Sequence, residues 1–188
     1  MKVIGNIDYP KVAELIKANN IVAIFQGKSE GGPRALGNRS LLFNPITIRM
    51  NDYVNKVKKR ELYRPVAGTI LLENASEWFH MLSLKESPYM TYAIDVIEEK
   101  ISKIPAIVHK NNTCRIQTVT KEQNYHYYNL ISAFKELTDV PILGNTSFNL
   151  GGEVIVETLR EALDVIERSK IEYLYLPEKK SLIYSENK

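Results

Sequence analysis

Short apolar runs typical of strands alternate irregularly with amphipathic helical segments, and this alternation limits the possible folds more than any other feature. The segment 8–20 places Val12, Leu15 and Ile16 on one helical face, with Asp8 as N-cap, and the strand-like run 21–25 follows directly. The same reasoning predicts further helices at 48–60, 74–79, 127–137 and 158–169, and further strands at 66–72, 90–97, 104–109, 115–119, 140–145, 173–176 and 181–184. This order predicts a mixed α/β or α+β fold, with one extended sheet flanked by helices.

The composition is that of an ordinary globular protein. Of 188 residues, 44% are hydrophobic and 25% are charged, and no repeat or long linker divides the chain, so we expect one domain over residues 1–188. The single Cys114 excludes an internal disulfide, the three histidines lack metal-ligand spacing, and no apolar run approaches about 18 residues. We therefore expect a cytoplasmic protein with no metal site of its own and no membrane span. Because the net charge is only +3, attraction for anions must come from local clusters.

The stretch EGGPRALGNRS, residues 30–40, has the character of an anion-binding turn. Its three glycines permit close backbone approach or positive φ, and Pro33 stiffens the turn. Arg34 and Arg39 supply forked donors that suit phosphate or carboxylate. The alternative is a surface turn whose arginines pair with nearby carboxylates. The stretch matches neither a Walker loop nor a dinucleotide fingerprint.

The most basic segment is NKVKKRELYRP, residues 55–65. If the helix continues to residue 60, Lys56 and Arg60 share one flank of its apolar stripe, whereas Lys59 lies opposite the stripe and is solvated. Lys56 and Arg60, with Arg64 just beyond the helix, are then candidate phosphate ligands. A fully solvated helix face is the alternative.

Two polar clusters lie at predicted strand ends. His109 precedes a tight turn, after which Thr113, Arg115 and Gln117 alternate along a strand and project from one face, which is either solvated or lines a polar cavity. Cys114 points the other way and is predicted to be a core residue. The second cluster follows the strand at 140–145 and comprises Asn145, Thr146, Ser147 and Asn149. It predicts either a ligand-binding strand end or a polar turn.

Together these segments provide cations and amides but no evident nucleophile and no acid–base pair. This inventory suits a nucleotide or phosphorylated substrate, with catalysis by positioning and charge neutralisation.

The motifs GKSEGGPRALGNRSLL, VKKRELYRPVA, SPYM, IPAIVHKNNTCRIQTV and VPILGNTSFNLGGEVIV resemble, in the same order, the C-terminal domain of the nodulation and tobramycin type of O-carbamoyltransferase. They span roughly residues 21–170. The resemblance implies a YrdC-like α/β fold that binds carbamoyl phosphate and ATP, with Mg²⁺ accompanying the nucleotide. It also implies formation of carbamoyl adenylate with release of phosphate and pyrophosphate. A separate actin-like domain of such enzymes then passes the carbamoyl group to an acceptor hydroxyl.

Carried over by motif, the resemblance assigns a set of candidate residues. The expected catalytic residues, around the phosphates and in the same cleft, are Arg34, Arg39, Lys56, Arg60, Arg115 and His109. The expected substrate- or nucleotide-binding residues are Lys28, Glu30, Arg64, Thr113, Gln117, Asn145, Ser147 and Asn149. Three positions depart from the family pattern: Lys28 replaces an arginine, Gly31 an aromatic residue and Asn111 an acidic residue. A carboxylate contact to a metal or ribose at Asn111 is therefore in doubt.

No actin-like domain precedes Met1 in this sequence, and this leaves alternatives open. The chain is expected to be the adenylate-forming half of a split carbamoyltransferase with a separately encoded actin-like partner. The alternatives are a non-catalytic nucleotide- or RNA-binding module and a domain cut from a longer enzyme. The modest net charge argues against strong nucleic-acid binding. The sequence does not identify the acceptor.

Overall fold

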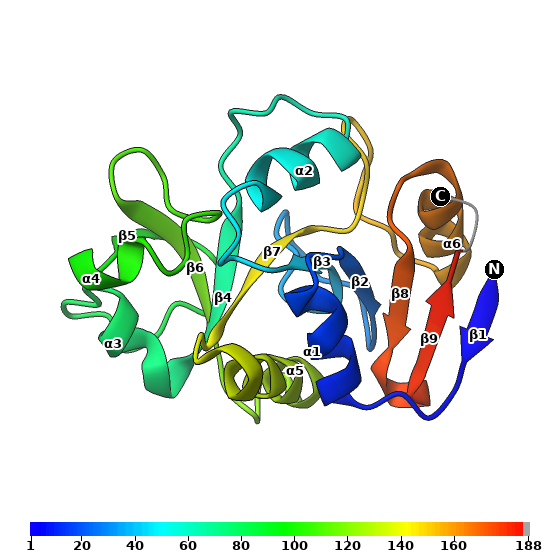
Figure 1. Cartoon of the computed structure of the whole chain (residues 1–188), viewed down its shortest axis with the longest axis horizontal. Helices are drawn as coiled ribbons and strands as arrows, with labels where there is room; N and C mark the ends of the chain where they lie inside the picture. Colours follow the sequence, from blue (N-terminus) through cyan, green and yellow to red (C-terminus); the bar gives the residue numbers. More distant parts are fainter. Residues whose placement is uncertain (186–188) are drawn as a thin grey trace.

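The computed structural model describes residues 1–185, which form a nine-stranded mixed sheet in the order β1-β9-β8-β2-β3-β7-β4-β6-β5 (Figure 1). The strands are β1 (Lys2–Ile4), β2 (Val22–Phe25), β3 (Arg39–Phe43), β4 (Ala67–Leu71), β5 (Ala93–Asp95), β6 (Thr113–Val119), β7 (Ile142–Ser147), β8 (Tyr173–Leu176) and β9 (Ser181–Tyr184). The pairs β2–β8 and β4–β6 are parallel and the other pairs are antiparallel. The predicted mixed α/β fold with one extended sheet is confirmed.

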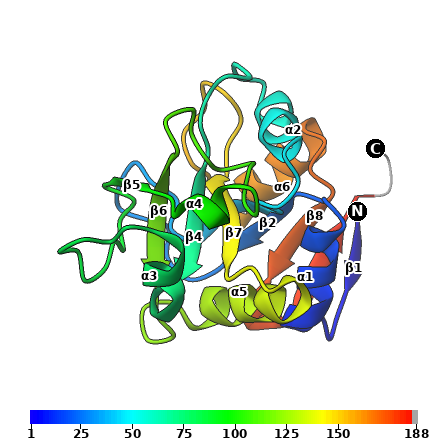
Figure 2. The same cartoon turned by 60° about the vertical axis from the view of Figure 1, so that its left-hand side comes forward.

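The helices are α1 (Tyr9–Lys17), α2 (Met50–Val57), α3 (Ala75–Trp78), α4 (Glu98–Ile101), α5 (Tyr125–Thr138) and α6 (Leu159–Arg168), with short 3₁₀ turns at Leu72–Asn74 and Pro177–Lys179. Asp8 caps α1 as predicted, and Thr158 and Glu161 form a reciprocal capping box at α6. Helices α1 and α5 pack together against the central strands, and α2 lies across the molecule from α5 in both views (Figures 1 and 2). Among residues 1–185, no helix has the length and apolarity needed to cross a bilayer.

The strand registers bring four loops to one end of the sheet. Ser40 near the start of β3 pairs with Ser147 at the end of β7, and Ala67 at the start of β4 pairs with Asn145. Strand β6 runs parallel to β4, so its first residues lie at this same end. The segments 26–38, 58–66, 96–112 and 148–158 therefore converge there. They contain half of the predicted site residues, and the others except Lys56 lie on β3, β6 and β7.

The prediction differs from the structure at several elements, and neither β3 nor α4 was predicted. Residues 104–109 form turns rather than a strand, although Ile104 and Ile107 are fully buried, because they cover the sheet without joining it. The strand predicted at 90–97 is reduced to β5. The edge strand β1 was not predicted, because all three of its residues are exposed and carry no burial pattern.

Candidate anion-binding site

The loop 26–38 is fastened to the sheet by side-chain amides. Gln117 Nε2 donates to the Leu36 carbonyl (3.0 Å) and Asn145 Nδ2 to the Ala35 carbonyl (3.2 Å). Of the four glycines in this loop, Gly27 (φ +48°) and Gly37 (φ +107°) have a positive φ, and a Cβ at Gly37 would lie 2.2 Å from the ring of Tyr127. The loop is therefore a fixed part of the structure at its two ends.

Asn145 and Gln117 are only 1% and 5% exposed. Beneath the loop, Thr69 Oγ1 donates to Gln117 Oε1 (2.9 Å) and Asn145 Nδ2 donates to Thr69 Oγ1 (3.1 Å). Both side chains hold the loop in place, but Asn145 Oδ1 is buried without a hydrogen-bond partner among the described residues and Gln117 lines a small surface hollow. That Asn145 contacts the nucleotide and that Gln117 lines the cleft stays a prediction. On the polar face of β6, Gln117 is buried, whereas Thr113 and Arg115 are partly exposed.

Arg39 also has a structural role. This differs from the prediction that Arg39 binds a phosphate. Its guanidinium is 3% exposed, and its five N–H groups donate to the carbonyls of Gln26, Gly27, Asn38 and Glu157. Its carbon centre lies 3.6 Å from the centroid of the Phe25 ring. Because all five donors are already used, Arg39 joins the loop 26–38 to the loop that leads to α6.

The remaining arginines approach one another at the end of the sheet, and we call them the arginine cluster: Arg34, Arg60, Arg64 and Arg115. Burial, together with the charges of Arg64 and Arg115, lowers the pKa of Arg60 to about 10. Burial and the charge of Arg34 lower the pKa of Arg115. Within residues 1–185, only Arg64 of these four forms an ion pair, with the exposed Glu61 (2.7 Å). The cluster thus concentrates positive charge with almost no protein counter-charge.

Two donors of the cluster are buried and have no hydrogen-bond partner in the described part of the chain. They are Arg60 Nη2 and Arg115 Nε. Arg60 is oriented by Asn55, whose Oδ1 accepts from Arg60 Nε (2.6 Å) while its amide nitrogen donates to the carbonyls of Leu62 and Arg64. Buried, fixed and unpaired guanidinium donors fit a phosphate-bearing ligand, because buried polar groups are normally hydrogen-bonded.

His109 and Thr113 lie beside the cluster. Their side chains are joined by a 3.0 Å contact between His109 Nδ1 and Thr113 Oγ1, and Thr113 Oγ1 donates to Asn111 Oδ1 (2.9 Å). Burial and the charge of Arg115 lower the pKa of His109, and a backbone hydrogen bond at Val66 partly offsets this shift. The structure places both residues where the sequence predicted them, with Thr113 orienting the imidazole.

Lys58 is the site residue that the sequence reasoning missed. It is 2% exposed, and its ammonium donates to the Ser147 carbonyl, to Ser147 Oγ (3.2 Å) and to Asn149 Oδ1 (2.8 Å). Burial lowers the pKa of Lys58 to about 7, and Arg60 contributes to the shift. The sequence does contain a signal for Lys58 in the basic segment 55–65: Lys58 lies two residues before Arg60 and directly after the apolar Val57.

A hollow of about 450 Å³ adjoins Lys58 on the side of Ser147 and Asn149. Ser29, Glu30, Pro33 and residues 153–157 complete its lining. Its hydroxyl, amide and carboxylate groups suit a polyhydroxylated ligand rather than a second phosphate. Lys28 is exposed, and its carbonyl accepts from Asn38 Nδ2 (2.8 Å).

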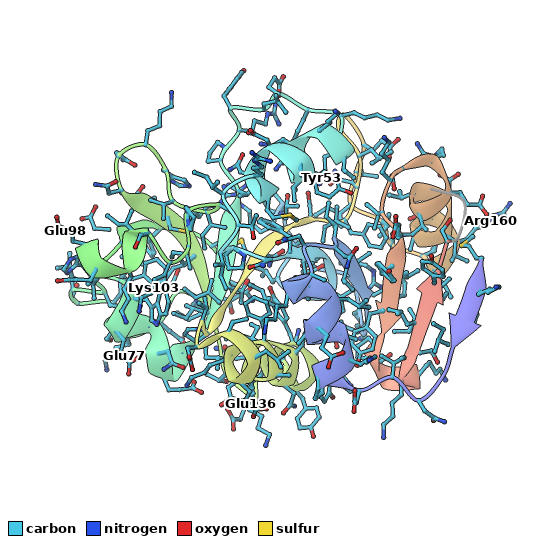
Figure 3. All side chains as sticks on the ribbon, viewed as in Figure 1. Tyr53, Glu77, Glu98, Lys103, Glu136 and Arg160 are labelled. Carbon is cyan, nitrogen blue, oxygen red and sulfur yellow. The ribbon has the colours of Figure 1, made fainter. Side chains whose placement is uncertain are left out.

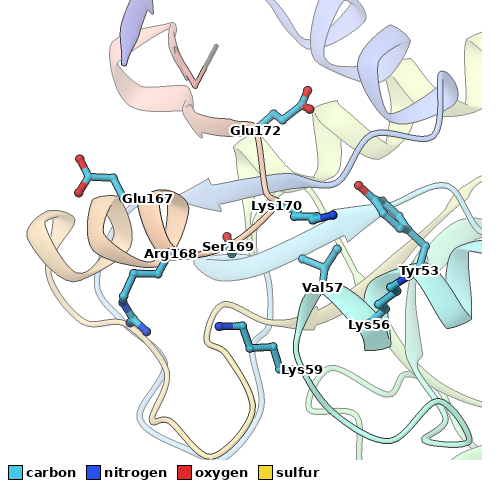
Figure 4. A pocket seen from close by; sticks show the side chains of 9 residues that line it. All are labelled: Tyr53, Lys56, Val57, Lys59, Glu167, Arg168, Ser169, Lys170 and Glu172. Carbon is cyan, nitrogen blue, oxygen red and sulfur yellow. The ribbon is translucent and has the colours of Figure 1, made fainter. Parts of the chain in front are cut away.

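Lys56 lies away from this site. Helix α2 ends at Val57 and Lys59 adopts the left-handed conformation (φ +54°), so Arg60 is not on the helix and does not share a flank with Lys56. Lys56 lines a groove of about 580 Å³ between α2 and α6, which we call the α2–α6 groove (Figure 4). The predicted Lys56–Arg60 pair is therefore corrected to Lys58 and Arg60.

Within residues 1–185, no group of three His, Cys, Asp or Glu side chains is placed to hold a metal ion. Cys114 is fully buried, as predicted, and burial raises the pKa of its thiol to about 12.

The sequence matches a known family. Residues 13–181 match the family described as the carbamoyltransferase C-terminus, and the chain belongs to that family. It is 43% identical to nodulation protein NolNO of Sinorhizobium fredii over 81% of this chain and 23% of that protein. It is 35% identical to the 3'-hydroxymethylcephem-O-carbamoyltransferase of Streptomyces clavuligerus over 88% of this chain and 31% of that enzyme. The chain therefore spans less than a third of these relatives.

Two solved structures share the fold. Full-length HypF in its phosphate- and nucleotide-bound form matches 97% of this chain and 22% of that chain, with a TM-score of 0.59 and 20% identity. Sua5 of P. abyssi, complexed with L-threonine, matches 88% of this chain and 45% of that chain, with a TM-score of 0.61 and 16% identity. These similarities confirm the expected YrdC-like fold.

Proposed function

We propose that this domain binds carbamoyl phosphate and ATP with its Mg²⁺ and forms carbamoyl adenylate. Water cleaves carbamoyl phosphate to carbamate and phosphate, and a carbamate oxygen then attacks the α-phosphorus of ATP and displaces pyrophosphate. The observation that carries the proposal is the arginine cluster, in which Arg60 and Arg115 present buried, unpaired donors. Such donors stabilise phosphate charge as it develops and leaves, and they need no nucleophile from the protein. The family membership and the nucleotide-bound HypF neighbour support the same assignment.

The residues divide the task in this proposal. The arginine cluster, Lys58 and His109 bind the phosphates, and the hollow beside Ser147 and Asn149 receives the ribose or base. Mg²⁺ arrives on the nucleotide phosphates rather than on a protein carboxylate set. A separate actin-like domain, which would correspond to the remaining length of the relatives, then transfers the carbamoyl group to the hydroxyl of an acceptor molecule. We place this chemistry in the cytoplasm, where ATP is available.

The direct test follows pyrophosphate release from the protein with ATP, carbamoyl phosphate and Mg²⁺. We expect release that depends on both substrates. Arg115→Met should weaken ATP binding about 10- to 100-fold, because a charge-assisted contact is lost, whereas the remote surface variant Lys103→Ala should bind normally. Tight ATP binding with no pyrophosphate release, alone or with the N-terminal region of a relative added, would instead indicate a nucleotide- or RNA-binding module.

A further inference from the structure

Arg34 lies on the exposed part of the loop, residues 31–34. Within residues 1–185 it forms no ion pair, and it follows the sequence Gly31-Gly32-Pro33. A Cβ added at Gly31 or Gly32 would meet nothing within 4 Å, and neither residue has a positive φ. Packing therefore does not fix this segment. Its glycines also increase the conformational entropy that must be lost to order it.

The side chain of Glu30 closes this segment. Glu30 Oε1 accepts from the backbone N–H groups of Leu36 (2.7 Å), Asn38 (2.8 Å) and Arg39 (3.3 Å). Three N–H groups that converge on one oxygen form the kind of concave backbone site that proteins use for anions. Here the anion is a carboxylate of the same loop, so residues 31–35 are drawn into a closed turn that carries Arg34.

The other oxygen of Glu30 faces the protein interior. Glu30 Oε2 is buried, as is the hydroxyl of Tyr127, and neither has a hydrogen-bond partner among the described residues. Burial raises the pKa of Tyr127, and the charge of Glu30 adds to the shift, so the two groups are near each other. Glu30 is thus held between the backbone of its loop and α5, at the edge of the hollow that it lines with Ser147 and Asn149.

We propose that Glu30 is the positioning residue of the arginine cluster. By closing the loop that carries Arg34, it holds Arg34 near Arg115. The proposal revises the expectation that Glu30 binds the nucleotide, and its effect on ligand affinity rests on the proposed anion site. Its direct claim concerns the loop itself and does not depend on any ligand.

The ligand-free test is hydrogen exchange of the Leu36, Asn38 and Arg39 amides. Glu30→Gln keeps the side-chain size but loses the charge, and we expect these amides to exchange about tenfold faster, with the sheet amides unchanged. Glu136→Gln makes the same chemical change on the outside of α5 (Figure 3) and should change nothing. Unchanged protection of all three amides in Glu30→Gln would overturn the proposal whatever the ligand results.

The second test is a double-mutant cycle read by pyrophosphate affinity. We expect Glu30→Gln and Arg34→Ala each to weaken binding about tenfold, and the double variant to bind no worse than Arg34→Ala alone, since Glu30 acts through Arg34. Additive losses would show that Glu30 acts independently of Arg34 and would refute the positioning role. Arg34→Ala could leave the pyrophosphate affinity unchanged while the three loop amides exchange faster in Glu30→Gln. That result would support the role of Glu30 in closing the loop and would refute the proposed anion site. Glu30→Asp keeps the charge but shortens its reach, and it replaces Glu30→Gln in the cycle if circular dichroism shows that the glutamine variant is unfolded.

Discussion

The arginine cluster and the α2–α6 groove both gather positive side chains, but their charges are balanced in opposite ways. In the groove, Arg168 forms ion pairs with Glu153 (2.8 Å) and Asp164 (2.7 Å), and its hydrogen bonds to these carboxylates raise its pKa. In the cluster, burial and neighbouring arginines lower the pKa of Arg60. A cation that the protein already neutralises needs no ligand, whereas one that is buried beside other cations is stabilised by an external anion.

The comparison also separates residues within the site, because burial alone does not identify a ligand-binding cation. Arg39 and Lys58 are about equally buried, but the five N–H groups of Arg39 all meet carbonyls of the main chain. Arg60 and Arg115 keep one unpaired buried donor each. Among the buried arginines, free donors therefore distinguish a binding residue from a structural one. Lys58, whose ammonium donates to Ser147 and Asn149, is assigned to the site by its position beside Arg60.

The largest expected effect tests this distinction at Arg39. Arg39→Met should lower the free energy of unfolding by about 3 kcal/mol or more, because several carbonyls lose a charged donor at once. Chemical denaturation measures the loss. In the temperature range where the variant remains folded, pyrophosphate should bind within about twofold of the wild type. A stable Arg39→Met variant that no longer binds pyrophosphate would reverse the assignment and return Arg39 to the site.

The sequence predicted the parts of the molecule that depend on neighbouring residues. The cap at Asp8 and the apolar stripe of α2 are local patterns, and each appears in the structure. The run 104–109 was wrongly predicted as a strand, because a buried turn and a buried strand have the same apolar composition.

The site was predictable as a set of segments but not residue by residue. Whether Lys56 or Lys58 joins Arg60 depends on where α2 ends, which is set by the left-handed turn at Lys59. Whether Arg34 or Arg39 is free depends on the carbonyl of Glu157, which is 118 residues from Arg39. Long-range contacts of this kind leave no trace in the local sequence.

A smaller effect is expected from the titration of Lys58. Its pKa is lowered from 10.5 to about 7 in the folded protein, so between these values the unfolded chain holds a proton that the folded protein has released. The free energy of unfolding should therefore rise with pH across this window, by at most about 1.4 kcal/mol per pH unit from this one group. Lys58→Met lacks the group, and subtracting its stability curve from that of the wild type isolates the contribution. A difference that is flat from pH 7 to 10 would mean that Ser147 and Asn149 keep the ammonium charged.

The same titration should appear in binding, with sulfate as the probe because its charge is constant over this range. An anion beside Lys58 favours its protonated form, so sulfate affinity should fall several-fold as the pH rises above 7. In Lys58→Arg this fall should be absent, because the guanidinium stays charged. Equal pH profiles for the two proteins would remove Lys58 from the site.

The smallest effect is expected in the α2–α6 groove, and it tests the other half of the comparison. Lys56 and Lys170 are exposed and line the groove with Glu167 and Glu172 (Figure 4), so water already solvates their charges. Lys56→Gln and Lys170→Gln should each change the free energy of unfolding by less than about 0.5 kcal/mol and leave pyrophosphate affinity unchanged. Isothermal titration should give one pyrophosphate per chain for both variants and for the wild type. A second pyrophosphate lost in Lys170→Gln would show that exposed lysines in this fold bind anions without burial, and the distinction between the two regions would no longer hold.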